Sequence, residues 1–402
     1  MPQRRLISAV LIALTFVLAI PSVGDSSTGN RLRDRQAGSA SAQGPAFALL
    51  ADNRLFAVSL PDGKVVAQRR LGPPPPLGVR GEWWRSADGH YLALSKNGHT
   101  VYAVVPGLVP GRLGGTDHLA IIDAATVRVR AAYPLIRGLA FHSVAVGRRT
   151  GRLYLFGNRA VGGGFASSPA DAVVIVMDAK TGTVLANWTA KKAQGYNHFS
   201  YRGLVSPNER KLFISYHGFD TTGVDAFTIS RRGLQRCQSP CCQLPYGPRD
   251  GCILGHGSME LYGDGLLVSE GNGSIYEIGA AGRVRRTFDS GLKHNHLLEF
   301  TIDRQAGRLY AVGSCSYAGG FTALDLRSGR SRILVQEPNY DICGERSALA
   351  SSSLLVIAKT LGVIPQIGLQ GHLLFLDTRT GQVQRRILTP AEAVDVLVSP
   401  GS

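Results

Sequence analysis

The short signature D-x-x-[ST]-G occurs three times, as Asp178-Ala-Lys-Thr-Gly182, Asp325-Leu-Arg-Ser-Gly329 and Asp377-Thr-Arg-Thr-Gly381. Each copy predicts a tight turn between two strands. Weaker copies lie at Pro61-Asp-Gly63, Asp123-Ala-Ala-Thr-Val127, Ser230-Arg-Arg-Gly233 and Glu277-Ile-Gly-Ala-Ala-Gly282. Turns recurring about every 40 to 50 residues, with several strands per unit, are typical of a β-propeller. The sequence therefore predicts an all-β fold, a seven-bladed β-propeller.

Each blade is expected to contain four strands, the first innermost and the fourth outermost. In blade two, Ala87-Asp-Gly89 predicts the turn after the innermost strand, and Tyr91–Leu94 the strand that follows it. Blade one supplies only three strands, at residues 47–50, 54–58 and 65–69. The segment Ala393-Val-Asp-Val-Leu-Val-Ser-Pro400 resembles the innermost strand of another blade. If it pairs beside residues 47–50, it closes the ring and leaves no open edge.

The N-terminus has the features of an export signal. Arg4 and Arg5 precede an uncharged apolar run from Leu6 to Ile20, and this run is short for a membrane span. We therefore expect a signal peptide at residues 1–24, a disordered linker at 25–44 and the propeller at 45–402. The protein would be secreted, periplasmic or extracellular, with membrane attachment only if the N-terminal segment stays uncleaved.

The formal net charge is +16. Arginine blocks such as Arg283-Val-Arg285-Arg286 and Arg385-Arg386 fall on predicted outer strands. They indicate either attraction to an acidic partner, cell wall or lipid headgroup, or simply a solvated rim. No nucleic-acid-binding motif accompanies the charge, so no nucleic acid partner is expected.

Six cysteines in an exported chain predict disulfides. The candidates are Cys237, Cys241, Cys242, Cys252, Cys315 and Cys343. A bridge between Cys315 and Cys343 would join blade six to the start of blade seven, but spacing alone does not assign connectivity. Zinc is the alternative, although the C-x3-C-C-x9-C spacing matches no strong zinc signature.

Three strand segments carry a family resemblance: Arg152-Leu-Tyr-Leu155, Lys211-Leu-Phe-Ile214 and Arg308-Leu-Tyr-Ala-Val312. Together with the hairpin signature, they resemble exported bacterial propellers of the YVTN-repeat kind. That group belongs to the superfamily that includes quinoprotein amine dehydrogenase heavy chains. The resemblance covers residues 45 to 400 and implies the fold more than an activity, because propellers host many functions.

The expected strand directions define a top face, which carries the connections between blades and the loops between second and third strands. Several of these loops are long, and long loops on a rigid scaffold are common binding sites. Polar residues near the starts of the innermost strands would surround the same end of the central channel. The predicted ligand-binding residues are Glu82, His142, His198, His256 and Glu345.

His294 and His296 are the predicted metal ligands, because alternate residues of a strand share a face. No organic cofactor motif is evident, and a divalent metal in the channel is the one cofactor considered. His90, His99, His118, His217 and His372 are expected to be surface or packing residues.

Two functional hypotheses follow. The first is a binding or interaction module whose top face recognises an unknown ligand or protein. The alternative is an enzyme using the channel histidines, either a metal-dependent lyase or lactonase or a subunit of a periplasmic oxidoreductase.

Overall fold

The computed structural model describes residues 44–73, 90–107, 116–159, 172–190, 198–218, 222–230, 232–237, 256–270, 273–279, 283–292, 298–313, 319–344, 346–359 and 370–399. All of them belong to the second of the chain's two compact units, Met1–Ala40 and Ser41–Ser402. Every helix or strand in these ranges is a β-strand. Within them, no helix long and apolar enough to cross a membrane occurs. The predicted signal peptide and residues 25–43 of the predicted linker lie outside the described residues.

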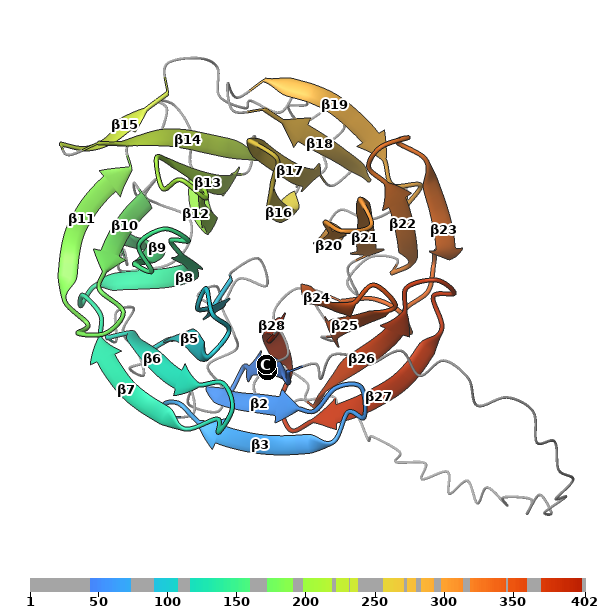
Figure 1. Cartoon of the computed structure of the whole chain (residues 1–402), viewed down its shortest axis with the longest axis horizontal. Coiled ribbons are helices and arrows are strands. Elements are labelled where there is room, and N and C mark those ends of the chain that lie inside the picture. Colours follow the sequence, from blue (N-terminus) through green and yellow to red (C-terminus); the bar gives the residue numbers. More distant parts are fainter. Residues whose placement is uncertain are drawn as a thin grey trace, which may run out of the picture. The chain divides into compact units, whose positions relative to one another are not determined.

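The described strands form seven four-stranded antiparallel sheets arranged as blades around one centre (Figure 1). Blades one to four, from the innermost strand outward, are as follows. Blade one is β28 (Ala393–Val398), β1 (Ala46–Leu50), β2 (Arg54–Val58) and β3 (Val65–Arg70); blade two is β4 (Leu92–Leu94), β5 (Thr100–Val105), β6 (His118–Asp123) and β7 (Val129–Pro134); blade three is β8 (Leu139–Val146), β9 (Leu153–Arg159), β10 (Ala172–Met177) and β11 (Val184–Ala190); blade four is β12 (His198–Val205), β13 (Lys211–Gly218), β14 (Thr222–Ser230) and β15 (Gly233–Arg236).

Blades five to seven repeat this order. Blade five is β16 (His256–Tyr262), β17 (Gly265–Glu270), β18 (Ser274–Ile278) and β19 (Val284–Asp289); blade six is β20 (Leu298–Asp303), β21 (Arg308–Gly313), β22 (Phe321–Asp325) and β23 (Ser331–Val335); blade seven is β24 (Arg346–Ser351), β25 (Leu354–Lys359), β26 (Gly371–Asp377) and β27 (Val383–Thr389). The prediction of an all-β, seven-bladed propeller is confirmed.

The C-terminal strand closes the ring, as predicted. β28 pairs antiparallel with β1, with Ala48 opposite Val396. Val394 and Val396 are 1% and 4% exposed. The sheet of blade one is therefore completed by the other end of the chain, and the inner edge of β1 is covered.

The blades pack through apolar side chains on both faces of their middle strands. β10 is a continuous apolar run and β5 is one after its first residue, Thr100, and nearly every residue in both strands is buried. Separate apolar clusters fill the spaces between neighbouring blades, for example between blades four and five and between blades seven and one. The outermost strands are mostly exposed. Burial on two faces explains why the middle strands lack the alternating pattern of a half-exposed sheet.

The repeated signature forms the turn between the third and fourth strands. In blade three, Asp178 Oδ1 accepts hydrogen bonds from the backbone N–H groups of Lys180 and Thr181, at 2.8 and 2.9 Å. Gly182 closes the turn with a φ of 71°. Asp325 and Asp377 accept the equivalent bonds. The carboxylate and the left-handed glycine explain why these residue types recur.

Side chains on three outer strands fasten their blades to the turn of the next blade. The Tyr133 hydroxyl on β7 donates to Lys180 O at 2.9 Å, and Arg332 on β23 donates to Arg379 O at 2.7 Å. Arg286 on β19 donates to Leu326 O at 2.8 Å. Neighbouring turns therefore lie side by side along one edge of the ring. Part of the arginine content of the outer strands has this structural role.

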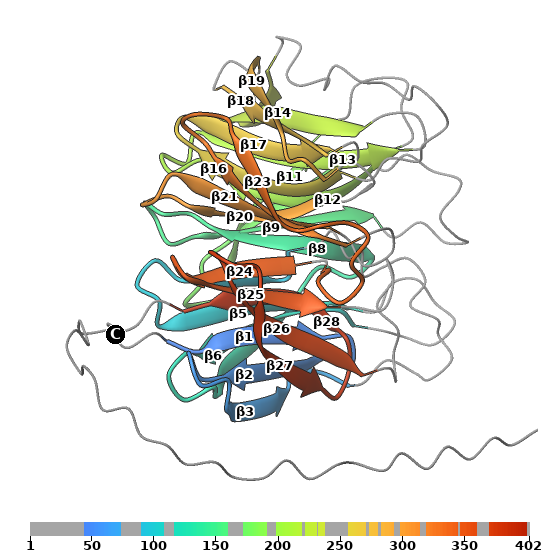
Figure 2. The same ribbon diagram turned by 90° about the vertical axis from the view of Figure 1, so that its right-hand side faces the viewer.

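Antiparallel pairing places the turns after first and third strands on one face, which we call the bottom face; Figure 2 shows the ring from the side. The strand ends that lead into blade-to-blade connections, and into the loops between second and third strands, lie on the opposite, top face. The predicted division of the connections between two faces follows from this pairing.

The predicted strand order of blade two is wrong. Leu92–Leu94 is the innermost strand β4 and not the second, because β4 pairs with β5 and β5 with β6. The turn after the innermost strand is therefore at residues 95–99, where Gly98 has a φ of 76°. With this correction His90, expected to be a surface or packing residue, lies two residues before the innermost strand β4.

Candidate functional site

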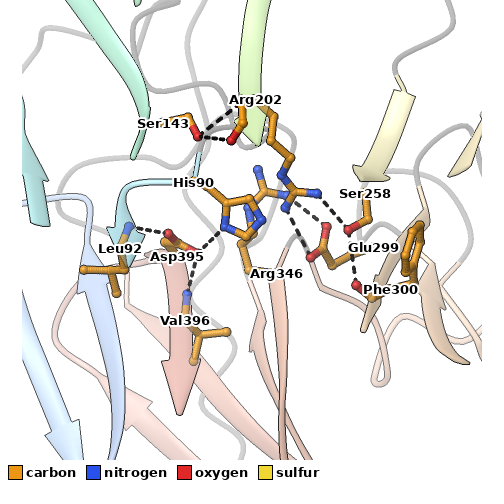
Figure 3. A network of polar contacts seen from close by, with 11 residues as sticks. His90, Leu92, Ser143, Arg202, Ser258, Glu299, Phe300, Arg346, Asp395 and Val396 are labelled. Carbon is orange, nitrogen blue, oxygen red and sulfur yellow. Dashed lines mark hydrogen bonds and ion pairs between the residues drawn. The ribbon is translucent and has the colours of Figure 1, made fainter. Parts of the chain in front are cut away.

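The innermost strands bring polar side chains together at the centre of the ring (Figure 3). Every blade contributes at least one member of this group, which we call the central cluster. In blade order from one to seven, the members are Asp395, His90, Ser143, Arg202, Ser258, Glu299 and Arg346. Except for His90, all are buried. Buried charged residues need hydrogen-bond or ion-pair partners. The contacts of each one therefore indicate whether the protein itself satisfies it or leaves groups for a ligand.

β-bulges set the direction of three inner-strand side chains. The pairing register shifts between Phe141 and Ser143 in β8, between Ser200 and Gly203 in β12, and between His256 and Met259 in β16. Arg202 and Ser258 lie in these shifts. Their backbone N–H groups donate to Ser215 Oγ and Ser269 Oγ on the second strands, at 3.1 and 2.7 Å. A bulge redirects a side chain, and here a serine satisfies the backbone group that the bulge leaves unpaired.

Short polar side chains join neighbouring inner strands. Ser258 Oγ donates to Phe300 O on blade six at 3.1 Å. Asp395 Oδ2 accepts from the backbone N–H of Leu92 on blade two at 2.7 Å. Ser143 Oγ accepts from the backbone N–H of Gly203 on blade four at 3.3 Å. These contacts hold the inner strands in register around the ring.

Glu299 lies between two buried arginines. Arg346 Nη1 donates to Glu299 Oε2 at 3.1 Å. Arg202 Nη2 lies 3.6 Å from Glu299 Oε1, within ion-pair distance. The three side chains come from blades four, six and seven, so the ion pairs join the inner strands of different blades. Glu299 is the acceptor that links both guanidinium groups.

Arg202 keeps hydrogen-bonding capacity that the described residues do not use. Its side chain is 1% exposed. Nη1 donates to Ser258 Oγ at 2.8 Å, but Nε and Nη2 have no hydrogen-bond acceptor among the described residues. Burial lowers the pKa of Arg202 to about 10, against the opposing effect of Glu299. The group therefore stays cationic at neutral pH, with donors left for a further acceptor.

His90 lies beside Asp395 and near the two arginines. His90 Nδ1 is 3.6 Å from Asp395 Oδ1, and the His90 side chain is 28% exposed. Burial lowers the pKa of His90, and Arg202 and Arg346 lower it further, while Asp395 opposes both. The imidazole is therefore neutral at neutral pH and can donate through one nitrogen and accept through the other.

Glu260 is a carboxyl group that titrates near neutral pH. It lies on β16, and Arg304 Nη2 is 3.9 Å from its Oε2. Burial raises the pKa of Glu260 to about 7; nearby Glu299 adds to the increase, while Arg304 and Arg202 oppose it. A carboxyl group with this pKa can give or take a proton under physiological conditions.

The sequence-predicted ligand residues have different outcomes. His142 lies at the register shift of β8 and is buried, and burial lowers its pKa to about 4, so its imidazole is neutral. His198 and His256 are the first residues of the inner strands β12 and β16. Glu82, His294, His296 and Glu345 lie outside the described residues. A role in ligand or metal binding stays a prediction for all seven.

The disulfide and metal predictions rest mainly on residues outside the described ranges. Cys237 and Cys343 are described, and Cys343 is fully buried. Cys241, Cys242, Cys252 and Cys315 are not described. Among the described residues, no group of three or more His, Cys, Asp or Glu side chains is placed to hold a metal ion.

The strongest features of the central cluster were not predicted as site residues. Arg202, Glu299 and Arg346 were not among the residues predicted to bind a ligand or a metal. His90 was expected to be a surface or packing residue. One signal was available in the sequence. Arg202 precedes Gly-Leu-Val205 in an apolar inner-strand segment, and a charged residue in such a segment is either buried with partners or part of a binding site.

Comparisons with known proteins identify the fold but no family. No family model matches the sequence, and no curated protein matches it. Solved structures do match it. A putative 6-phosphogluconolactonase from Bacteroides uniformis is 13% identical with a TM-score of 0.58, and the alignment covers 89% of this chain and 99% of that one. A functionally unknown protein from Desulfotomaculum acetoxidans is 11% identical with the same TM-score, covering 89% and 100%.

Two further structures contain enzymes or parts of enzymes. Hydrazine synthase from Kuenenia stuttgartiensis is 15% identical with a TM-score of 0.50, covering 79% of this chain and 91% of that one. Dihydro-heme d1 dehydrogenase NirN in complex with DHE is 14% identical with a TM-score of 0.50, covering 91% and 77%. At these identities the similarity establishes the architecture alone. The chain is a seven-bladed β-propeller, and its function must be argued from its own residues.

Proposed function

We propose that this chain is an exported β-propeller that binds a small acidic ligand at the centre of its ring, entering from the top face. Arg202 is the observation that carries the proposal. It is a fully buried guanidinium whose Nε and Nη2 make no hydrogen bond to any described residue. A carboxylate or phosphate oxygen would accept from those donors, because a planar guanidinium suits such groups.

The position of the cluster supports entry from the top face. Arg346 is the first residue of β24 and Glu299 the second residue of β20, so both lie near the strand ends that face the top. The partly exposed His90 also lies before the start of its inner strand. A ligand at this end would meet a guanidinium whose Nε and Nη2 make no hydrogen bond to a described residue, and one neutral imidazole. A ligand with an acidic group for Arg202 and a neighbouring hydrogen-bonding group for His90 would contact both side chains.

Calorimetry with citrate, gluconate and inorganic phosphate tests the proposal. We expect at least one probe to bind, and Arg202→Lys to weaken it 10- to 100-fold, since a hydrogen bond to a charged group contributes about 1.5–3 kcal/mol. The matched control is Arg286→Lys, which changes an arginine paired with Glu277 on an outer strand. Failure of every acidic probe, or equal effects of the two variants, would contradict the proposal.

The second candidate function is catalysis, and Glu260 favours it. A carboxyl group with a pKa of about 7, close enough to Arg202 and Glu299 for both to affect it, has the properties of a general acid or base. The name of the B. uniformis structure suggests a lactone as the first substrate to try. Hydrolysis of δ-gluconolactone that follows a pKa near 7 and is lost in Glu260→Gln would favour an enzyme. Acidic-ligand binding without turnover would favour the binding module.

The metal-dependent and oxidoreductase alternatives are also proposals. A divalent ion would be held by His294 and His296, and a redox function would require a partner that carries the cofactor. Neither proposal rests on the contacts of the central cluster. They are tested by metal content and by co-purification of a cofactor-bearing subunit.

A further inference from the structure

The turns of the bottom face are rich in exposed cations. Every blade places at least one exposed Lys or Arg in these turns, and blade three alone places Arg148, Arg149, Arg152 and Lys180 there. Among the described residues of the same turns, the exposed carboxylates are Asp62 and Asp264. Asp264 is already neutralised by two hydrogen bonds from Arg285, at 2.7 and 2.8 Å.

Most other carboxylates of these turns accept hydrogen bonds from groups of the protein itself. Asp178, Asp325 and Asp377 accept backbone hydrogen bonds within their own turns. Glu209 is buried and accepts from Thr150 Oγ1 at 2.6 Å and from the Arg149 backbone N–H at 2.7 Å. The cations of the bottom face are therefore exposed, while most of its carboxylates are held in hydrogen bonds within the protein. The face carries a strong positive potential.

Exposed aliphatic residues lie next to these cations. Six of the nine exposed large hydrophobic side chains are the first or second residues of outermost strands, directly after the bottom turns. They are Val65, Val66, Val129, Val184, Leu185 and Val284, and we call them the aliphatic rim. Val129 lies between Arg128 and Arg130, and Leu185 follows the turn that contains Lys180. The positive charge would attract a soluble polyanion, but such a ligand would gain nothing from contact with the exposed aliphatic side chains.

We propose that the bottom face binds the surface of an anionic phospholipid membrane. Lys and Arg side chains would contact the headgroup phosphates, and the aliphatic rim would enter the boundary between headgroups and acyl chains. This contact is independent of the N-terminal segment, to which the sequence-based expectation limited membrane attachment. It leaves the top face, and the central cluster near it, open to solutes.

Co-sedimentation of the full chain with vesicles tests the proposal. The readout is the ratio of partition coefficients for phosphatidylcholine vesicles with and without 30% phosphatidylglycerol, at a fixed ionic strength of 0.1 M. Any contribution of the N-terminal segment is the same in the wild type and in the variants, so it cancels when their ratios are compared. Each Lys or Arg near an anionic surface strengthens binding about fivefold. The triple variant Arg128→Gln, Arg148→Gln and Lys180→Gln should lower the ratio about 100-fold.

The matched control is Arg69→Gln, Arg70→Gln and Arg137→Gln. It removes the same charge from exposed residues on the top side, two at the end of β3 and one in the connection between β7 and β8. We expect it to leave the ratio within a few-fold of the wild type. No preference for anionic vesicles, or equal losses in the two triple variants, would overturn the proposal. Salt-sensitive binding to soluble polyphosphate without vesicle binding would assign the face to a polymer instead.

A fluorescence probe tests the aliphatic rim separately. Leu185→Trp places a reporter beside the basic turns, and Leu388→Trp places one at the opposite end of an equally exposed outer strand. Anionic vesicles should shift the added emission to the blue in the first variant and leave it unchanged in the second. A shift in both variants, or in the second alone, would place the membrane contact elsewhere.

Discussion

Replacing Glu260 by glutamine should remove a specific loss of stability at high pH. Burial raises the pKa of Glu260 from 4.5 to about 7, so the folded protein holds this proton more tightly than the unfolded chain. The unfolded chain then binds fewer protons between these two pKa values, and the free energy of unfolding falls as pH rises through that window. The stabilising effect is present below pH 4.5 and is lost above pH 7.

The magnitude follows from the two pKa values. A shift of about 2.5 units corresponds to about 3 kcal/mol at 1.36 kcal/mol per unit. Between pH 5 and pH 8, the part that is lost is about 2.5 kcal/mol. The glutamine variant imitates the protonated carboxyl and does not titrate. Relative to the variant, the wild type should therefore lose about 2.5 kcal/mol of stability between pH 5 and pH 8.

Urea unfolding followed by intrinsic fluorescence, at pH 5, 6, 7 and 8, measures this difference. Asp264→Asn is the control, because Asp264 is an exposed carboxylate whose pKa is lowered by the hydrogen bond from Arg285. Relative to this control variant, the free energy of unfolding of the wild type should not fall between pH 5 and pH 8. A Glu260→Gln difference that stays constant from pH 5 to pH 8 would refute the assignment of a raised pKa.

Three further predictions concern the turns, the ring closure and the metal. Gly151→Ala should cost about 1–2 kcal/mol from its φ of 72° alone. Gly182→Ala, with φ 71° and a new Cβ 2.4 Å from the neighbouring tyrosine ring, should cost at least about 1 kcal/mol more by urea unfolding; equal costs would contradict the described packing. Asp395→Ala leaves buried backbone N–H groups of two blades without their acceptor and should destabilise by about 1–3 kcal/mol; a neutral effect would contradict the inter-blade role. Purified protein should contain about one divalent ion by elemental analysis, lost in the His294→Ala, His296→Ala variant, if the predicted metal site exists; metal-free wild type would refute that site.

The fold was predictable because its signals are local and repeated. Asp178 and Gly182 fix a turn through their own hydrogen bonds and backbone conformation, so the same residues recur wherever the turn recurs. The closing strand was predictable as well, since Ala393–Val398 has the pattern of an inner strand with no blade following it. Blade two was misassigned because its inner strand is only three residues long, and a turn signal upstream of it was taken for the inner turn.

The site was predictable only in part, for a different physical reason. Which inner-strand side chains meet depends on bulges, and the shifts around His142, Arg202 and Ser258 have no local sequence signature. A one-residue change in register turns a side chain to the other face. The Arg202–Glu299 pair joins residues 97 positions apart on separate blades, so pattern analysis of single strands could not bring them together.

Nuclear magnetic resonance of the arginine Nε–H groups tests the central claim most directly. The Arg202 Nε–H signal, assigned by its absence in Arg202→Lys, reports on a donor that has no acceptor among the described residues. Saturation with an acidic probe that binds by calorimetry should move this signal downfield and slow its exchange with water. An unchanged Arg202 signal in the saturated protein would contradict the account, because the ligand would then be bound elsewhere.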